Sequence, residues 1–365
     1  MILFRYLSLE LWKSFFLTLF SLTSLLLLAR FISLLVKLAE ENLTAKDYLK
    51  LISFFIPFFL AYLLPLAALM ASIFLFMRLV QDKELLALES LGLSFERLMR
   101  PVLVFSIATL LLSYFVTLAY LPWSKHAYRT FLFELTKRKI EKGIPARAFV
   151  PITPGITLFV KDSWKKGQNF AVAFIIDETQ SNKKGLIFAR KGNFHFKKGS
   201  IELTLNEGSL HIVNKDFSSI QEIQFKTYIY RTQVKELNQK RTPSRGEMGL
   251  KELKSKALSL PEGDDKQVKY LVEYYRRLSF PWAAFFLPLI GSYLGAMIKT
   301  SGRVTGGVIA IVLYLGYYFS QSIGVSLAES KILPPQLAMN IPNVLLVLIL
   351  IFFFYLTKKQ IIRPH

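Results

Sequence analysis

The chain has 365 residues, of which 53% are hydrophobic, and its formal net charge at pH 7 is +21. Its mean hydropathy is positive, which excludes an ordinary soluble domain. The sequence contains no cysteine, which excludes a disulfide framework, thiolate metal sites and cysteine catalysis. The positive charge favours acidic partners, such as phospholipid head groups, phosphorylated glycolipids or nucleic acid.

Six long apolar segments predict membrane-spanning helices. The first is residues 14–36, interpreted as an uncleaved signal anchor because no small-residue cleavage site follows it. The other five lie at about residues 51–77, 101–121, 278–298, 304–327 and 333–356. With the N-terminus inside, the cytoplasmic segments hold eleven lysines and arginines and the short outside loops hold four. We therefore expect both termini in the cytoplasm.

A short polar helix is predicted over residues 82–92, within the segment QDKELLALESLGLS at 81–94 between spans two and three. Asp82 is expected to cap its N-terminus and Gly92 to end it. Its apolar positions repeat at helical spacing: Leu85, Leu88 and Leu91. Such a helix is either a linker lying on the bilayer surface or a coupling helix that passes force from a soluble motor into the membrane.

Residues 123–277 are too polar for lipid, and the topology places them outside. Alternating segments predict strands at 156–160, 170–176, 186–190, 201–206, 209–213 and 220–231, separated by turn residues. Strands of this length and spacing predict a small sandwich or jelly roll. Helical shoulders are expected at 124–142 and 235–277. Candidates for an apolar interior are Phe159, Val172, Phe174, Ile176, Leu203 and Leu205.

Several motifs occur in an order that matches one family. They are RYL (5–7), LPLA (64–67), RLVQDKELLALESLGLS (78–94), LPW (121–123) and IPN (341–343). With these motifs the chain resembles the permease subunits of the lipopolysaccharide exporter, the LptF/LptG family, and FLFELTKRKIEKGIPARAF at 131–149 is more similar to the LptF type. The expected fold is an α-helical integral membrane protein with six transmembrane helices and an inserted periplasmic all-β jelly-roll-like domain, divided as 1–122, 123–277 and 278–365.

The resemblance implies a non-catalytic permease subunit in the bacterial inner membrane. It implies a heterodimer with a paralogous LptG-type permease, driven by a cytoplasmic LptB-type ATPase dimer that binds the ATP. Lipopolysaccharide would leave the outer leaflet through a lateral gate between span one of one subunit and span five of the other. It would then pass to a periplasmic LptC-type β-domain, joined through a sheet edge at 156–160 or 220–231.

The residues themselves agree with a motor on another chain. The sequence has no G-x-x-x-x-G-K-[ST] phosphate loop, so we expect no cofactor in this chain, and nucleic acid is a poor partner outside the membrane. The four histidines are too scattered for a metal centre, and no catalytic constellation is present. Two alternatives stay open: a subunit of another ATP-driven lipid or mechanical machine, and a membrane-anchored β-domain scaffold without transport.

The candidate site residues fall into two groups. The resemblance favours a coupling helix, in which Glu84 matches the acidic position that faces the ATPase, Glu89 is second, and the apolar positions Leu85 and Leu88 belong to the same interface. Arg30 is the one charged residue within the first span, and Lys37 lies seven residues on, along the same helix face. Arg30 either snorkels to the head groups or binds a lipid phosphate, and the family's basic residues in this region favour binding.

Glycines in spans four and five indicate how these two helices pack. Gly291 and Gly295 form a small-xxx-small pair in span four, which predicts tight helix packing. Gly302, Gly306 and Gly307 open span five, where a thin helix could pack closely or part from a neighbour.

Overall fold

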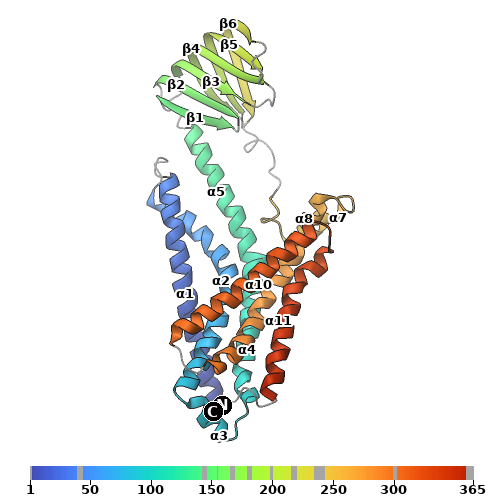
Figure 1. Cartoon of the computed structure of the whole chain (residues 1–365). Helices are drawn as coiled ribbons and strands as arrows, with labels where there is room; N and C mark the ends of the chain where they lie inside the picture. The colour runs from blue at the N-terminus through green and yellow to red at the C-terminus, as the bar shows by residue number, and fades with distance from the viewer. Residues whose placement is uncertain are drawn as a thin grey trace. The chain divides into compact units, whose positions relative to one another are not determined.

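The computed structural model describes residues 2–38, 44–141, 146–153, 155–164, 169–178, 183–197, 200–214, 220–233, 243–298 and 302–358. The chain forms two compact units, a helical unit of Met1–Tyr128 with Pro243–His365, and a β unit of Arg129–Thr242 (Figure 1). Six helices are long and apolar enough to cross a membrane, which confirms the six predicted spans. The β unit is smaller than the predicted insert 123–277, because the segment from Pro243 onward packs with the helices.

The helices before the β unit are α1 (Ile2–Leu38), α2 (Ala45–Gln81), α3 (Glu84–Ser90), α4 (Phe95–Phe115), the π-helix η2 (Val116–Tyr120) and α5 (Leu121–Glu141). Those after it are α7 (Leu250–Leu258), α8 (Asp265–Ser279), the 3₁₀-helix η3 (Phe280–Trp282), α9 (Ala283–Met297), α10 (Arg303–Glu329) and α11 (Pro335–Lys358). The fourth span combines α8, η3 and α9, since η3 continues α8 into α9 without a loop.

The α2–α9 pair is the packed centre of the helical unit. The most apolar stretches of the second and fourth spans are each 72% buried. An added Cβ at Gly295 would lie 2.5 Å from the Ile73 carbonyl oxygen, and one at Gly291 would lie 2.9 Å from the Leu69 carbonyl oxygen. These two glycines therefore let the helix backbones approach closely, which confirms the predicted small-xxx-small packing.

The π-helix η2 accommodates a proline, Pro122, which comes two residues after it. Pro122 has no N–H, and in a regular α-helix its ring would meet the carbonyl four residues earlier, at Leu118. Here the Leu121 N–H donates to the Val116 oxygen, five residues back. The extra residue in this turn lets α4 continue into α5 and changes which side chains face inward, among them the buried Thr117.

The β unit contains one antiparallel sheet in the order β1-β2-β3-β4-β5-β6 among its described strands. The strands are β1 (Ala148–Thr153), β2 (Ile156–Trp164), β3 (Asn169–Asp177), β4 (Lys183–Lys197), β5 (Ser200–Asn214) and β6 (Ile220–Gln233). The predicted all-β domain is confirmed. Its strands are joined in sequence order within a single sheet, whereas we expected the two layers of a sandwich or jelly roll, and β1 was not anticipated.

One strand was predicted as two. A turn was expected at Asn206-Glu207-Gly208, but β5 runs through it, with Glu207 in the left-handed region at φ 54°. Val172 of β3 has a similar φ of 51°. Neither residue is paired in the register with β4, and the interruption falls in both cases at Arg190, between Ala189 and Lys191. The segment at 206–208 therefore interrupts the pairing locally and does not end the strand.

One face of the sheet supplies the core of the β unit. Its fully buried side chains include Leu158, Val160, Ile175, Leu203 and Leu205, so the prediction for Leu203 and Leu205 is confirmed. The other predicted interior residues are corrected: Val172 is exposed, and Phe159, Phe174 and Ile176 are only half-buried. Successive strand residues point to opposite faces, and Leu158 and Val160 occupy the core face of β2, which turns Phe159 to the other.

Candidate functional site

The helix α3 lies at the end of the helical unit where α1 begins (Figure 1). It starts at Glu84, and its N-cap is Lys83 in the left-handed conformation (φ 57°) without a side-chain cap. The predicted cap, Asp82, instead ends α2: its N–H donates to the Arg78 oxygen (2.9 Å), and its side chain also lies beside Arg78 (Oδ2–Nε 4.0 Å). Gly92 ends the helix as predicted, with φ +80° and the Gly92 N–H and Leu93 N–H donating to the Glu89 and Leu88 oxygens (2.9 and 3.2 Å).

A chain of polar contacts ties α3 to α1 and α2. Arg78 donates to the Tyr6 hydroxyl oxygen (2.7 Å), and this hydroxyl donates to Oε2 of Glu84 (3.3 Å). A second nitrogen of Arg78 forms an ion pair with Glu10 (2.7 Å). Glu84, the predicted ATPase-facing carboxylate, is thus bonded within its own chain. The sequence did not indicate that Tyr6, Glu10 and Arg78 belong to this site. The motifs RYL and RLVQDKE nevertheless contain two of these residues, Tyr6 and Arg78.

The leucines of α3 divide between two faces. Leu85 is 1% exposed and lies in the main hydrophobic core, and Leu88 packs against that core. Leu86 and Leu91 are 52% and 78% exposed, so the predicted stripe of Leu85, Leu88 and Leu91 does not form a single surface. Leu85 and Leu88 anchor α3, while Leu86 and Leu91 are available to a partner; coupling roles for Glu84, Glu89, Leu85 and Leu88 stay predictions.

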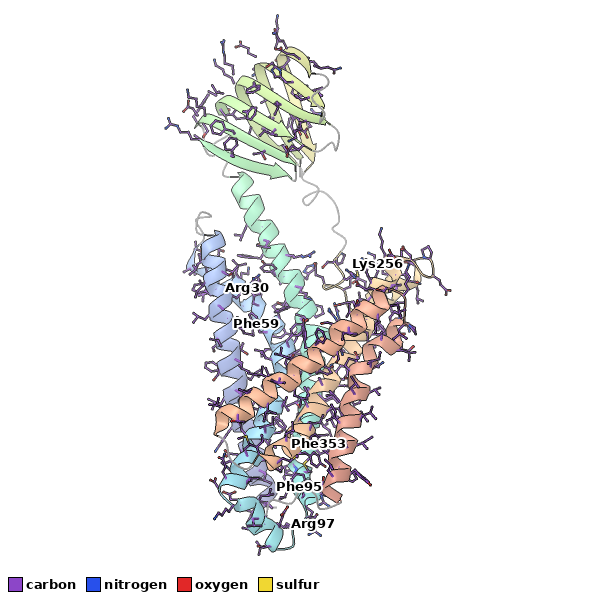
Figure 2. The ribbon with its side chains drawn as sticks, viewed as in Figure 1. Arg30, Phe59, Phe95, Arg97, Lys256 and Phe353 are labelled. Carbon is purple, nitrogen blue, oxygen red and sulfur yellow. The ribbon has the colours of Figure 1, made fainter. Side chains whose placement is uncertain are left out.

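Arg30 lies in the part of α1 farther from α3 (Figure 2). Its side chain is exposed, and its guanidinium carbon lies 4.6 Å from the ring centre of Phe55 on α2, a cation–π contact. The Arg30 side chain therefore extends from α1 toward α2. Lys37 lies in the last turn of α1, and its side chain is outside the described part of the structure, so the predicted pairing with Arg30 stays a prediction.

The helices α1 and α10 have wide unpacked faces. The most apolar stretch of α1 is 17% buried and that of α10 is 28% buried. On α10, an added Cβ at Gly306 would lie 2.4 Å from the Met77 sulfur, whereas nothing lies within 4 Å of one at Gly316. Early α10 therefore packs closely on α2, while its middle leaves a face free for lipid or another subunit.

The β unit presents β1 and β6 as the edges of its described sheet. The predicted edge at 156–160 is wrong, because β2 pairs with both β1 and β3, and the predicted edge at 220–231 corresponds to β6.

The Tyr230 hydroxyl on β6 donates to Oδ2 of Asp177 on β3 (2.9 Å). Burial, followed by this hydrogen bond, raises the pKa of Tyr230 above its ordinary value. Among the described residues, no group of three or more histidines and carboxylates could hold a metal ion.

Comparison with known proteins gives two matches. The family described as "Lipopolysaccharide export system permease LptF/LptG" matches residues 5–356. The chain is also 24% identical over 275 residues to "Uncharacterized protein RP871" of Rickettsia prowazekii (strain Madrid E), an alignment that covers 74% of this chain and 75% of that protein.

The family match extends through all six spans and the β unit. It agrees with a multi-pass inner-membrane subunit whose role is transport and not catalysis. The chain belongs to the LptF/LptG family of lipopolysaccharide export system permeases.

Proposed function

We propose that this chain is the LptF-type half of an ATP-driven heterodimer that extracts lipopolysaccharide from the outer leaflet of the inner membrane. Its partners would be a paralogous LptG-type permease, an LptB-type ATPase dimer on the cytoplasmic side, and an LptC-type β-domain protein in the periplasm. The termini and α3 would be cytoplasmic and the β unit periplasmic. Cargo would enter between α1 of one permease and α10 of the other and leave along the β unit.

The observation that carries this proposal is the attachment of α3. A helix that transmits force must be held firmly on its own protein and must still offer a surface to the motor. Leu85 in the core and the bonds of Tyr6 to Glu84 and Arg78 provide the attachment. The exposed Leu86 and Leu91 provide the surface. A linker lying passively on a bilayer needs no hydrogen bond to α1.

The cargo path is supported by the unpacked spans and by Arg30. The exposed apolar faces of α1 and α10 suit acyl chains or a second permease. Arg30 offers a guanidinium fork that can form bidentate bonds to a phosphate, while Phe55 restrains the side chain on one side. The predicted lipid-binding role of Arg30 and Lys37 is part of this proposal.

The test uses the purified complex with its ATPase in vesicles that contain lipopolysaccharide, with ATP hydrolysis and lipopolysaccharide release measured together. Glu84→Lys should reduce release far more than complex assembly, because it reverses the charge at the motor-facing end of α3. Tyr6→Phe removes the two hydrogen bonds of the hydroxyl, to Arg78 and Glu84, each worth about 0.5–1.5 kcal/mol. Because Leu85 still anchors α3 in the core and Glu84 keeps its charge, this variant should have a smaller effect.

Glu262→Lys, an equal charge reversal at an exposed residue between α7 and α8, is the matched control and should release lipopolysaccharide normally. Normal release by Glu84→Lys at equal complex levels would contradict the coupling role. Equal losses in Tyr6→Phe and Glu84→Lys would instead mean that Glu84 only fastens α3 to α1.

A further inference from the structure

A second polar site lies inside the helical unit, away from Arg30. A partly open cavity of about 70 Å³ is bordered by α2, η2, α8 and α10, which is room for roughly five water-sized groups. Its lining includes Tyr62, Thr117, Arg276, Phe280, Tyr318 and Gln321. The cavity therefore combines aromatic walls with a cation and neutral polar groups.

Two of the neutral groups are buried without a partner. Thr117 and Gln321 are 5% and 4% exposed. Among the described residues, Oγ1 of Thr117 and Oε1 of Gln321 have no hydrogen-bond partner. The amide nitrogen of Gln321 donates to the Tyr317 hydroxyl (3.1 Å), which leaves its carbonyl oxygen as an acceptor. Buried polar atoms in folded proteins are nearly always hydrogen-bonded, so the cavity suits a ligand that both accepts and donates.

The charge of the cavity is positive. Each of the three side-chain nitrogens of Arg277 has a partner: Nε pairs with Oε1 of Glu273 (2.9 Å), and the other two donate to the backbone oxygens of Met248 (2.6 Å) and Arg245 (2.9 Å). The other oxygen of Glu273 pairs with Arg276. Two guanidinium groups thus share one carboxylate, and Arg276 keeps N–H donors for an anion.

The aromatic side chains connect the cavity to the exterior of the helical unit. The Tyr62 ring lies 5.5 Å from Phe280 and 6.1 Å from Tyr318, and Phe58 lies 5.2 Å from Tyr62. Phe58 and Tyr318 are exposed. These residues belong to membrane-spanning helices, where an exposed aromatic rim is the surroundings of an acyl chain near its head group.

We propose that this cavity binds the head group of a membrane glycerophospholipid. Its phosphate would accept hydrogen bonds from Arg276 and Thr117, and a head-group hydroxyl or ammonium would donate to Oε1 of Gln321. The acyl chains would leave along Phe58 and Tyr318. The inference does not depend on which lipid the complex exports, since it rests on the side chains of the cavity alone.

The experiment uses the delipidated full-length chain in detergent, with binding followed by native mass spectrometry. The three probes are phosphatidylglycerol, diacylglycerol with the same chains, and inorganic phosphate. Wild-type protein should retain phosphatidylglycerol. Arg276→Gln should bind it about ten- to a hundredfold more weakly, as expected for loss of a charge-assisted hydrogen bond. Arg97→Gln removes an exposed arginine in the first turn of α4 and is the control, which should bind like wild type.

Thr117→Val keeps the side-chain shape and removes the hydroxyl, so it tests the site if Arg276→Gln does not fold. It too should bind the lipid more weakly. Wild-type affinity in every folded cavity variant would overturn the proposal, as would diacylglycerol binding as tightly as phosphatidylglycerol. Binding of inorganic phosphate with no retention of phosphatidylglycerol would overturn the assignment to a lipid.

Discussion

Replacing Gly295 by alanine tests whether the contact between α9 and α2 is as close as the structure has it. The new Cβ would lie 2.5 Å from the Ile73 carbonyl oxygen and 2.9 Å from the Phe76 Cβ. The nearest atom belongs to the backbone of a helix, so no side-chain rotation relieves the contact. The two helices must separate, or α9 must turn.

The expected loss follows from two opposing terms. Inserting a methyl group into a close-packed interface costs about 1–3 kcal/mol. Replacing glycine by alanine within a helix contributes about 1 kcal/mol in the opposite direction. Gly316→Ala provides the second term alone, because nothing lies within 4 Å of an added Cβ there. The difference in unfolding free energy between the two variants should therefore be about 1–3 kcal/mol.

The assay is unfolding of the full chain in mixed micelles as the fraction of denaturing detergent rises, followed by far-UV circular dichroism at the helical minimum. That signal reports on the helical unit, which contains both glycines. Gly295→Ala should unfold first, wild type next, and Gly316→Ala last or together with wild type. Equal stability of Gly295→Ala and Gly316→Ala would refute the close approach of α9 to α2.

Two further predictions concern cargo and handover. Lipopolysaccharide crosslinking and release should fall in the order wild type, Arg30→Lys, Arg30→Ala and Arg30→Glu, because lysine keeps the charge but loses the planar fork; equal crosslinking by wild type and Arg30→Glu at equal protein levels would remove Arg30 from the site. A photocrosslinker at Ile229, exposed on the edge strand β6, should capture a β-domain partner or lipid, since edge strands pair readily with another chain. The same group at Leu158, buried in β2, is the control, and equal yields at both positions would exclude edge pairing at β6.

Local features of this protein could be read from the sequence. A span needs only enough consecutive apolar residues to cross the bilayer, so all six were predicted. Gly92 was recognised as the end of α3, because the left-handed residue after a helix is usually glycine. The pair Gly291 and Gly295 predicted close packing in the same way. Each of these features depends on residues near one another in the chain.

Which side chains contact one another, and which face of a strand is buried, depended on the tertiary structure. The tie from Glu84 to Tyr6 joins residues 78 positions apart, and Arg30 meets its aromatic neighbour on a different helix. An alternating strand pattern allows either face to be the core, and in β2 Leu158 lies in the buried cluster with Ile175 while Phe159 lies on the opposite face.

The sequence by itself determined the class of protein. The length of the apolar segments, the distribution of lysine and arginine between loops, and the order of the motifs can all be read along the chain without knowing which residues meet in space. The structure alone decided which groups act together. It turned Leu85 inward and left Leu91 exposed, and it brought Thr117, Arg276 and Gln321 to one cavity from three separate segments. The physical reason is that burial and hydrogen bonding depend on distances in space, which residues far apart in the chain acquire only when the helices pack.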